Sequence, residues 1–200
     1  MHQRSVKIEK VNILVARTAQ EIDEAYRHLS TAQALGCDTE TSSLSARSGR
    51  LFSVQFSDGE LNVLVPVSEG VNLGRLEEIL SSPRITKIFH NAKFDIEFLR
   101  EKGFQVENVF CTMIAEKILT RGADQSCSLA ETLYRYFAVD LEKSHRAKFT
   151  RRWDGVWTPE LVNYALSDVI HLPRLYAEQK LWLERLGLTE DFNRQMQKIK

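Results

Sequence analysis

The sequence of 200 residues contains few of the residues that interrupt or cross-link a chain. It has 9 glycines, 4 prolines and 3 cysteines, and no stretch rich in glycine, proline or serine divides it. Extended disorder and a linker between domains are therefore not expected. We expect a single domain over residues 1–200, in which the polar residues 1–10 form a loose arm. The cysteines are widely spaced with no CxxC pair, which favours reduced thiols over a disulfide framework or a thiolate zinc site.

Long apolar runs and an excess of one charge are also missing. No apolar run approaches the roughly 20 residues of a membrane span, and the first residues lack the apolar core of a secretory signal. We therefore expect no membrane partner and a cytoplasmic or nucleoid-associated protein that is not secreted. Lys and Arg together number 27, as do Asp and Glu. This balance excludes a histone-like basic binder and an acidic tail protein, and taken alone it argues against a nucleic-acid partner, which usually requires a positive face.

The residues that are present suit an ordinary globular protein, with 43% hydrophobic and 27% charged residues. Apolar patterns predict strands over residues 12–16, 34–37, 51–56, 61–65 and 85–89. They predict helices, several with capping signals, over residues 18–31, 73–80, 92–101, 112–120, 128–139 and 158–186. Pro173 lies inside the last helix, so we expect a kink or break there. This order predicts an α/β fold, in which a mixed sheet of a β-meander plus parallel strands is flanked by helices.

Two carboxylates follow the apolar strand at residues 34–37. Asp38 and Glu40 are two residues apart, so on a strand their side chains point to the same face. A divalent cation relieves the repulsion between them, and hard cations prefer oxygen ligands. For this pair alone, the alternative is a solvated strand end.

Further acidic positions occur on two predicted helices. Asp95 falls in the first turn after the strand at 85–89, where it can point back over the end of the sheet, although the helix dipole alone also favours an acid there. Tyr164 and Asp168 are four residues apart and share one face of the last helix. That face is otherwise apolar, and an unpaired Asp is costly to bury. The alternative for Asp168 is a place at the edge of the apolar stripe, bonded to a backbone group.

These motifs occur together, in the order Asp38-Thr-Glu40, His90-Asn-Ala-Lys-Phe-Asp95 and Tyr164-Ala-Leu-Ser-Asp168. In this combination the sequence resembles the DEDD superfamily of 3′→5′ exonucleases, in its tyrosine-containing branch (DEDDy). That branch includes ribonuclease D, the Werner-type exonucleases and the proofreading domain of family A DNA polymerases. The resemblance covers residues 35–183. One departure is Cys111-Thr112, where many relatives have Asp-Thr, and it affects a helix start rather than a metal ligand.

The resemblance implies a ribonuclease-H-like fold with a two-metal site. The two divalent cations would be Mg²⁺, with Mn²⁺ as a substitute. They would be held by four acids: Asp38, Glu40, Asp95 and Asp168. The Tyr164 hydroxyl would orient the attacking water. Two cations roughly 3.5–4 Å apart supply a hydroxide at neutral pH and stabilise the leaving 3′ oxygen. An all-oxygen ligand set suits both Mg²⁺ and Mn²⁺.

The same resemblance implies contacts with the terminal nucleotide. Leu44 lies just beyond the first motif, where the family places an apolar wedge against the terminal base. Asn91 and Phe94 lie beside the second acid, where family members touch the terminal nucleotide. The alternatives are core packing for Leu44 and Phe94 and a helix cap for Asn91.

A basic segment precedes the last helix. Residues 143–152 hold five cations and no acid, and Trp153 and Trp157 follow them. Cations beside aromatic rings suit a single strand, because the cations contact phosphates and the rings contact bases. Since family members often carry basic residues at this point, we expect Arg151 and Arg152 to bind nucleic acid. The alternative is a solvated loop with the tryptophans in the core.

We therefore expect a metal-dependent 3′→5′ exonuclease that releases mononucleotides from a single-stranded 3′ end. The amino-acid sequences of the first two motifs are closer to those of polymerase proofreading domains, which slightly favours DNA. The Trp-rich approach to Tyr164 resembles ribonuclease D and leaves RNA processing open. The rival classes are a non-catalytic nucleic-acid-binding module and a metallophosphatase for small nucleotides. The chain is expected to act alone or as part of a longer polymerase or nuclease chain.

The neutral charge is compatible with this expectation. Four of the acids are assigned to a site with two divalent cations, and bound cations set the local charge that phosphates meet. We expect weak, metal-dependent and salt-sensitive binding at a strand end, rather than tight coating of a duplex.

Overall fold

The computed structural model describes residues 12–121, 123–141 and 148–199. The loose arm predicted for residues 1–10 and the first half of the basic segment lie outside them. Within the described residues, six strands form one sheet in the order β1-β4-β3-β2-β5-β6. They are β1 (Asn12–Val15), β2 (Ala34–Thr41), β3 (Leu51–Ser57), β4 (Leu61–Val65), β5 (Thr86–Phe89) and β6 (Val109–Cys111). β3 pairs antiparallel with β2 and β4, and the other neighbours are parallel, so the predicted mixed sheet is confirmed.

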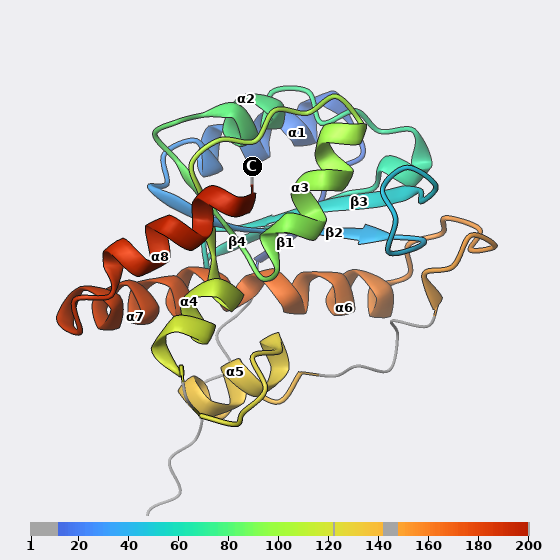
Figure 1. Ribbon diagram of the computed structural model, residues 1–200. Coiled ribbons are helices and arrows are strands. Elements are labelled where there is room, and N and C mark those ends of the chain that lie inside the picture. The colour runs from blue at the N-terminus through green and yellow to red at the C-terminus, as the bar shows by residue number, and fades with distance from the viewer. Residues whose placement is uncertain (1–11, 122, 142–147, 200) are drawn as a thin grey trace, which may run out of the picture.

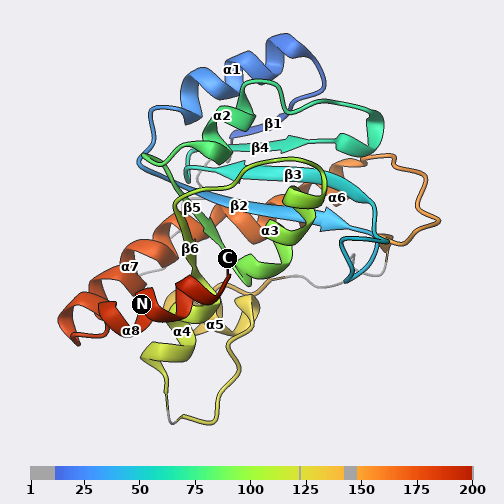
Figure 2. The ribbon, with the colours of Figure 1, turned by 45° about the horizontal axis from the view of Figure 1, so that its top comes forward.

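Helices cover both faces of this sheet (Figure 1). One face carries α1 (Ala19–Leu29), α2 (Leu76–Ser81) and α3 (Ala92–Glu101). The other face carries α6 (Pro159–Ile170) and α7 (Leu172–Arg185), with α4 (Thr112–Leu119), α5 (Leu129–Phe137) and α8 (Thr189–Met196) nearby. Short 3₁₀ helices cover Val67–Glu69 and Gln197–Ile199. A hydrophobic cluster fills each face of the sheet, and Figure 2 shows β2 in its middle, between β3 and β5.

Local sequence signals start several helices where they are predicted. The side chains of Thr18, Ser128 and Thr158 each accept a hydrogen bond from the amide three residues further on, and so cap α1, α5 and α6. The break predicted near Pro173 is confirmed, because α6 and α7 are separate helices that meet at His171. Proline occupies the first turn of α7, where its missing N–H has no consequence.

Other elements differ from the sequence-based expectation. The helix predicted from residue 73 begins three residues later, because Gly74 has a φ of 51° and lies outside the helical region. β6 was not predicted, since three residues are too few to show an apolar alternation. The last helix ends at Arg185, and Gly187 with a φ of 66° separates it from α8.

The cysteines and the helix lengths bear on two expectations from the sequence. Cys37, Cys111 and Cys127 are free thiols, and the first two are buried. Among the helices of the described residues, none is long and apolar enough to span a bilayer.

The end of β2 extends beyond its parallel neighbour. Pairing between β2 and β5 ends at Gly36 and Ile88, whereas β2 continues to Thr41. On one face of this strand, Gly36 allows the end of α6 to come close. A Cβ added to Gly36 would lie 2.6 Å from the Val169 carbonyl oxygen, a distance that real Cβ atoms essentially never show. The missing side chain therefore brings α6 against β2.

Candidate active site

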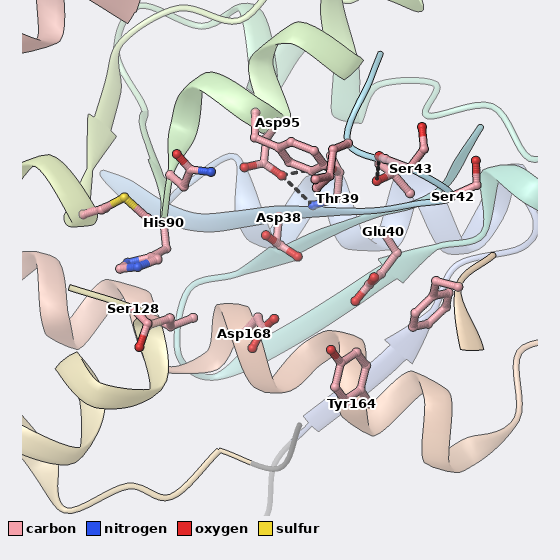
Figure 3. A pocket seen from close by; sticks show the side chains of 17 residues that line it. Asp38, Thr39, Glu40, Ser42, Ser43, His90, Asp95, Ser128, Tyr164 and Asp168 are labelled. Atoms are coloured by element: carbon pink, nitrogen blue, oxygen red, sulfur yellow. Dashed lines mark hydrogen bonds between the residues drawn. The ribbon is translucent and has the colours of Figure 1, made fainter. Parts of the chain in front are cut away.

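Three carboxylates meet where the end of β2 faces α6 (Figure 3). Asp38 and Glu40 lie opposite Gln55 and Ser53 of β3, so both point to the same face of the sheet, as their spacing predicts. Asp168 reaches them from α6. One oxygen from each of the three carboxylates lies within 4.8 Å of the other two, which makes this cluster the centre of the candidate site.

Tyr164 lies one helical turn before Asp168, and both side chains line the same cavity. Their spacing of four residues places them on one face of α6. The ring of Phe149 stacks on that of Tyr164, with centroids 5.9 Å apart and planes inclined by 29°. Phe149 also lines the cavity. Its role at the site was not predicted from the sequence, where its only signal is its place as an aromatic residue inside the basic segment.

Asp95 reaches the cavity from the other face of β2. It lies in the first turn of α3 and is only 2% exposed. Its Oδ1 atom accepts a hydrogen bond from the Thr39 hydroxyl at 2.7 Å and another from the Thr39 backbone N–H at 3.1 Å. Thr39 points to this face because it stands between Asp38 and Glu40 on the strand. Asp95 thus lines the same cavity but lies outside the cluster of three carboxylates.

Burial raises the pKa values of two of these carboxyl groups. Desolvation raises the pKa of Asp38 well above its ordinary value, and the nearby carboxylates, Asp95 first, raise it further. Desolvation also raises the pKa of Asp95 to about 7, although the hydrogen bonds from Thr39 oppose this shift. Closely spaced carboxylates repel one another, and hard divalent cations prefer all-oxygen ligands. The donor set therefore fits a divalent cation.

The cavity has a volume of about 440 Å³ and includes three residues predicted to contact the terminal nucleotide: Leu44, Asn91 and Phe94. Leu44 is 79% exposed, so the alternative of core packing is wrong for this residue. Phe94 is half-buried, with its ring centroid 5.1 Å from that of Phe98. For all three residues, contact with a nucleotide stays a prediction.

Asn91 occupies the N-cap position of α3 without acting as the expected cap. Its φ is 68°, in the left-handed region that asparagine tolerates better than most residues. Within the described chain its side chain makes no capping hydrogen bond. The expectation of a side-chain cap is therefore wrong, and the exposed Asn91 side chain lines the cavity instead.

The described part of the basic segment lies beside the site. Arg151 donates a hydrogen bond to the Ser48 carbonyl oxygen at 3.0 Å, and neither Arg151 nor Arg152 is among the described residues that line the cavity. Both are exposed, and their binding to nucleic acid stays a prediction. Trp157 is only 6% exposed and packs edge-on against Trp153, so the alternative that places the tryptophans in the core is confirmed for Trp157.

His90, the first residue of the second motif, forms a further wall of the cavity, although the sequence predicted no role for it. Its Nδ1 atom lies 2.8 Å from the Thr112 hydroxyl, and its Nε2 atom lies 3.0 Å from the Cys127 carbonyl oxygen. Burial lowers the pKa of His90 to about 4, so the ring is neutral at pH 7. Thr112, which follows the departure at Cys111, thereby links the start of α4 to this wall.

A mixed sheet with carboxylates converging at the end of its central strand defines a class of protein, the ribonuclease-H-like nucleases. A family model described as 3′-5′ exonuclease matches residues 13–184. Because this match covers most of the chain, the chain belongs to that 3′→5′ exonuclease family, within the DEDDy superfamily that its three motifs resemble.

Individual relatives show how far the similarity extends. Ribonuclease D of Nitrobacter hamburgensis is 29% identical over 132 residues, which make up 66% of this chain and 34% of that protein. DNA polymerase I of Aquifex aeolicus is 27% identical over 166 residues, 82% of this chain and 27% of that protein. The chain thus spans about a third of the length of the first curated relatives that it matches.

A solved relative is similar over most of its length. NrnC of Brucella melitensis, solved with bound Mg²⁺, is 32% identical and superposes with a TM-score of 0.74 over 84% of this chain and 82% of that chain. The same protein has been solved bound to pGG, with a TM-score of 0.75.

Proposed function

We propose that this chain is a metal-dependent 3′→5′ exonuclease that removes nucleotides from single-stranded 3′ ends. The observation that carries the proposal is the meeting of Asp38, Glu40 and Asp168 within 4.8 Å. Tyr164 and Asp95 line the same cavity. The chain therefore brings all the acids of its three family motifs, together with the tyrosine, around one space.

Two divalent cations, Mg²⁺ with Mn²⁺ substituting, complete the proposed site. The bound Mg²⁺ of NrnC supports a divalent cation here, and the all-oxygen donor set suits it. Asp38, Glu40 and Asp168 would hold one cation, and Asp95 would join Asp38 in holding the second. When bound, the cations supply water activation and stabilise charge on the leaving 3′ oxygen.

The remaining cavity residues would position the substrate. The Tyr164 hydroxyl would orient the attacking water, and the stacked Phe149 ring holds the Tyr164 ring in place. Leu44, exposed at the cavity, would pack on the terminal base, with Asn91 and Phe94 against the same nucleotide.

RNA is the substrate class that we propose first. The similarity to ribonuclease D supports RNA, and NrnC bound to pGG supports a short strand end as ligand. These relatives favour the alternative that the sequence left open over its slight preference for DNA. Similarity to DNA polymerase I keeps single-stranded DNA as the second candidate. A cytoplasmic or nucleoid-associated location stays a prediction from the sequence.

The test uses 5′-labelled RNA and DNA oligonucleotides of matched sequence, with Mg²⁺ or Mn²⁺. We expect stepwise shortening from the 3′ end, faster on RNA, that EDTA and Asp38→Asn abolish. The control is Asp23→Asn, which changes an exposed residue of α1 and should leave shortening unchanged. Faster shortening of DNA would reverse the choice of substrate.

Two other outcomes would overturn the proposed activity. Retardation of single strands on a gel, without shortening in Mn²⁺, would assign the protein to the binding modules. Cleavage of a small nucleotide ester, with oligonucleotides left intact, would assign it to the phosphatases.

A further inference from the structure

We infer that Thr39 is a positioning residue that holds Asp95 in place for metal binding, an inference that rests on the proposed function. Thr39 is the middle residue of the Asp38-Thr39-Glu40 motif and is not itself an acid. Both hydrogen-bond donors of this residue go to a single atom, Asp95 Oδ1, at 2.7 Å from the hydroxyl and 3.1 Å from the backbone N–H. The two residues are 56 positions apart in the chain.

The backbone donor is available because of the sheet topology. Pairing of β2 with β5 ends at Gly36, so among the described residues no parallel strand pairs with the edge of β2 beyond that residue. A buried backbone N–H needs an acceptor. The Asp95 carboxylate supplies one at Thr39, where a neighbouring strand would otherwise do so.

Burial makes these two hydrogen bonds strong. Thr39 is 5% exposed and Asp95 is 2% exposed, so little water competes for either group. Hydrogen bonds to a carboxylate are stronger than bonds between neutral groups, and more so away from water. Two donors on one oxygen restrict rotation of the Asp95 side chain about its own bonds.

The consequence concerns the spacing of the acids. Asp38 and Asp95 lie on opposite faces of β2, and the residue next to Asp38 binds Asp95 directly. The distance between these two carboxylates is therefore set by the strand itself, and not only by how α3 packs on the sheet. Removing the Thr39 hydroxyl should make the Asp95 side chain more mobile. It should thereby weaken binding of the cation that Asp95 would share with Asp38.

The alternative is that these bonds only satisfy a buried carboxylate and stabilise the fold. Thr39→Val separates the two roles, because valine keeps the branched shape suited to a strand and carries a methyl group in place of the hydroxyl. Thr39→Ser restores the hydroxyl without the methyl group. The matched control is Thr120→Val, which removes a hydroxyl bonded to the Glu116 carbonyl oxygen, also at 2.7 Å, outside the cavity.

The experiment measures three quantities for each variant of this chain: Mn²⁺ affinity by calorimetry, the Mn²⁺ concentration that half-saturates oligonucleotide shortening, and the melting temperature. For Thr39→Val we expect Mn²⁺ affinity to fall, and the half-saturating concentration to rise, by about 10- to 100-fold, as for other residues that orient metal ligands. For Thr39→Ser we expect an Mn²⁺ affinity and a half-saturating concentration close to those of the unmodified protein. Thr120→Val should bind Mn²⁺ with unchanged affinity.

The outcomes distinguish this inference from the proposed function. A Thr39→Val protein with a lower melting temperature but unchanged Mn²⁺ affinity would overturn the positioning role. A Thr39→Ser protein that binds Mn²⁺ as weakly as Thr39→Val would overturn it as well. If Thr39→Val does not fold, Thr39→Ala removes the same hydroxyl and is judged by the same criteria. If the unmodified protein neither binds Mn²⁺ nor shortens oligonucleotides, the proposed function itself is wrong.

Discussion

Alternation along one strand separates the side chains of three consecutive residues at the site. Asp38 and Glu40 point toward α6, whereas Thr39 points toward α3 and binds Asp95. One strand end therefore serves both faces of the sheet. A shift of β2 by a single residue would exchange these faces, so the register of β2 against β3 is a requirement of the site as well as of the core.

Tyr164 offers a test of a single hydroxyl. Tyr164→Phe keeps the ring that stacks on Phe149 and removes only the group proposed to orient water. We expect the rate of oligonucleotide shortening to fall by about 100-fold, since a small misplacement of a reactant has an effect of that size. Mn²⁺ affinity and the melting temperature should stay unchanged. A rate equal to that of the unmodified protein would remove Tyr164 from the mechanism.

Lys87 lies away from the site, and its burial should make the stability of the fold depend on pH. It is fully buried in β5, its Nζ donates to the carbonyl oxygens of Ser82 and Ile85, and desolvation lowers its pKa from 10.5 to about 8. The folded state therefore disfavours the charged lysine, and this penalty is complete below pH 8. It disappears as pH rises toward 10.5, because the lysine is then neutral in the unfolded chain as well.

The measurement compares urea unfolding of the unmodified protein and of Lys87→Met between pH 7 and pH 10. We expect the free energy of unfolding of the unmodified protein to rise relative to Lys87→Met as pH increases from 8. Lys93→Met, at an exposed position of α3, is the control for general effects of charge. A difference between the two proteins that does not change with pH would contradict the role of buried Lys87.

At the scale of the elements, the contact between β2 and α6 sets the geometry of the carboxylates. Gly36 is the residue of β2 on which this contact depends, since an added Cβ would meet the Val169 carbonyl oxygen at 2.6 Å and the Leu172 Cβ at 3.0 Å. Both atoms belong to the junction of α6 and α7, one helical turn or less from Asp168. The approach of two elements thus decides where one metal-site acid lies.

Gly36→Ala tests this contact. We expect the free energy of unfolding to fall by about 1–3 kcal/mol, as for other overpacked positions. We also expect weaker Mn²⁺ binding, because α6 must move away from β2 and take Asp168 with it. Calorimetry and urea unfolding measure the two effects. Mn²⁺ affinity equal to that of the unmodified protein would show that α6 does not need this close approach.

At the scale of the whole molecule, the carboxylate cluster links stability to metal. Asp38, Glu40 and Asp168 lie close enough to repel one another, and a cation that binds only the folded state stabilises it. At a metal concentration 100 times the dissociation constant, this effect is about 2.7 kcal/mol. We expect Mn²⁺ to raise the melting temperature, EDTA to reverse the rise, and Asp38→Asn to show little of it. An unchanged melting temperature at saturating Mn²⁺ would contradict the proposed metal site.

The sequence by itself determined most of the elements, and the four acids and the tyrosine that line the cavity. Helix caps such as Thr18 and Thr158, the alternation of Asp38 and Glu40, and the spacing of Tyr164 and Asp168 are all local features. Each depends on the geometry of one helix or strand, which a few neighbouring residues specify. For the same reason the break near Pro173 could be predicted, whereas the three-residue strand β6 could not.

Only the tertiary structure decided the contacts that refine the site. The bond from Thr39 to Asp95, the stack of Phe149 on Tyr164, and the approach of α6 to Gly36 each join segments that are separated in the chain. Such pairs depend on the order of strands in the sheet and on which face each helix covers. Those choices come from packing the whole core at once, and no local pattern in the sequence records them.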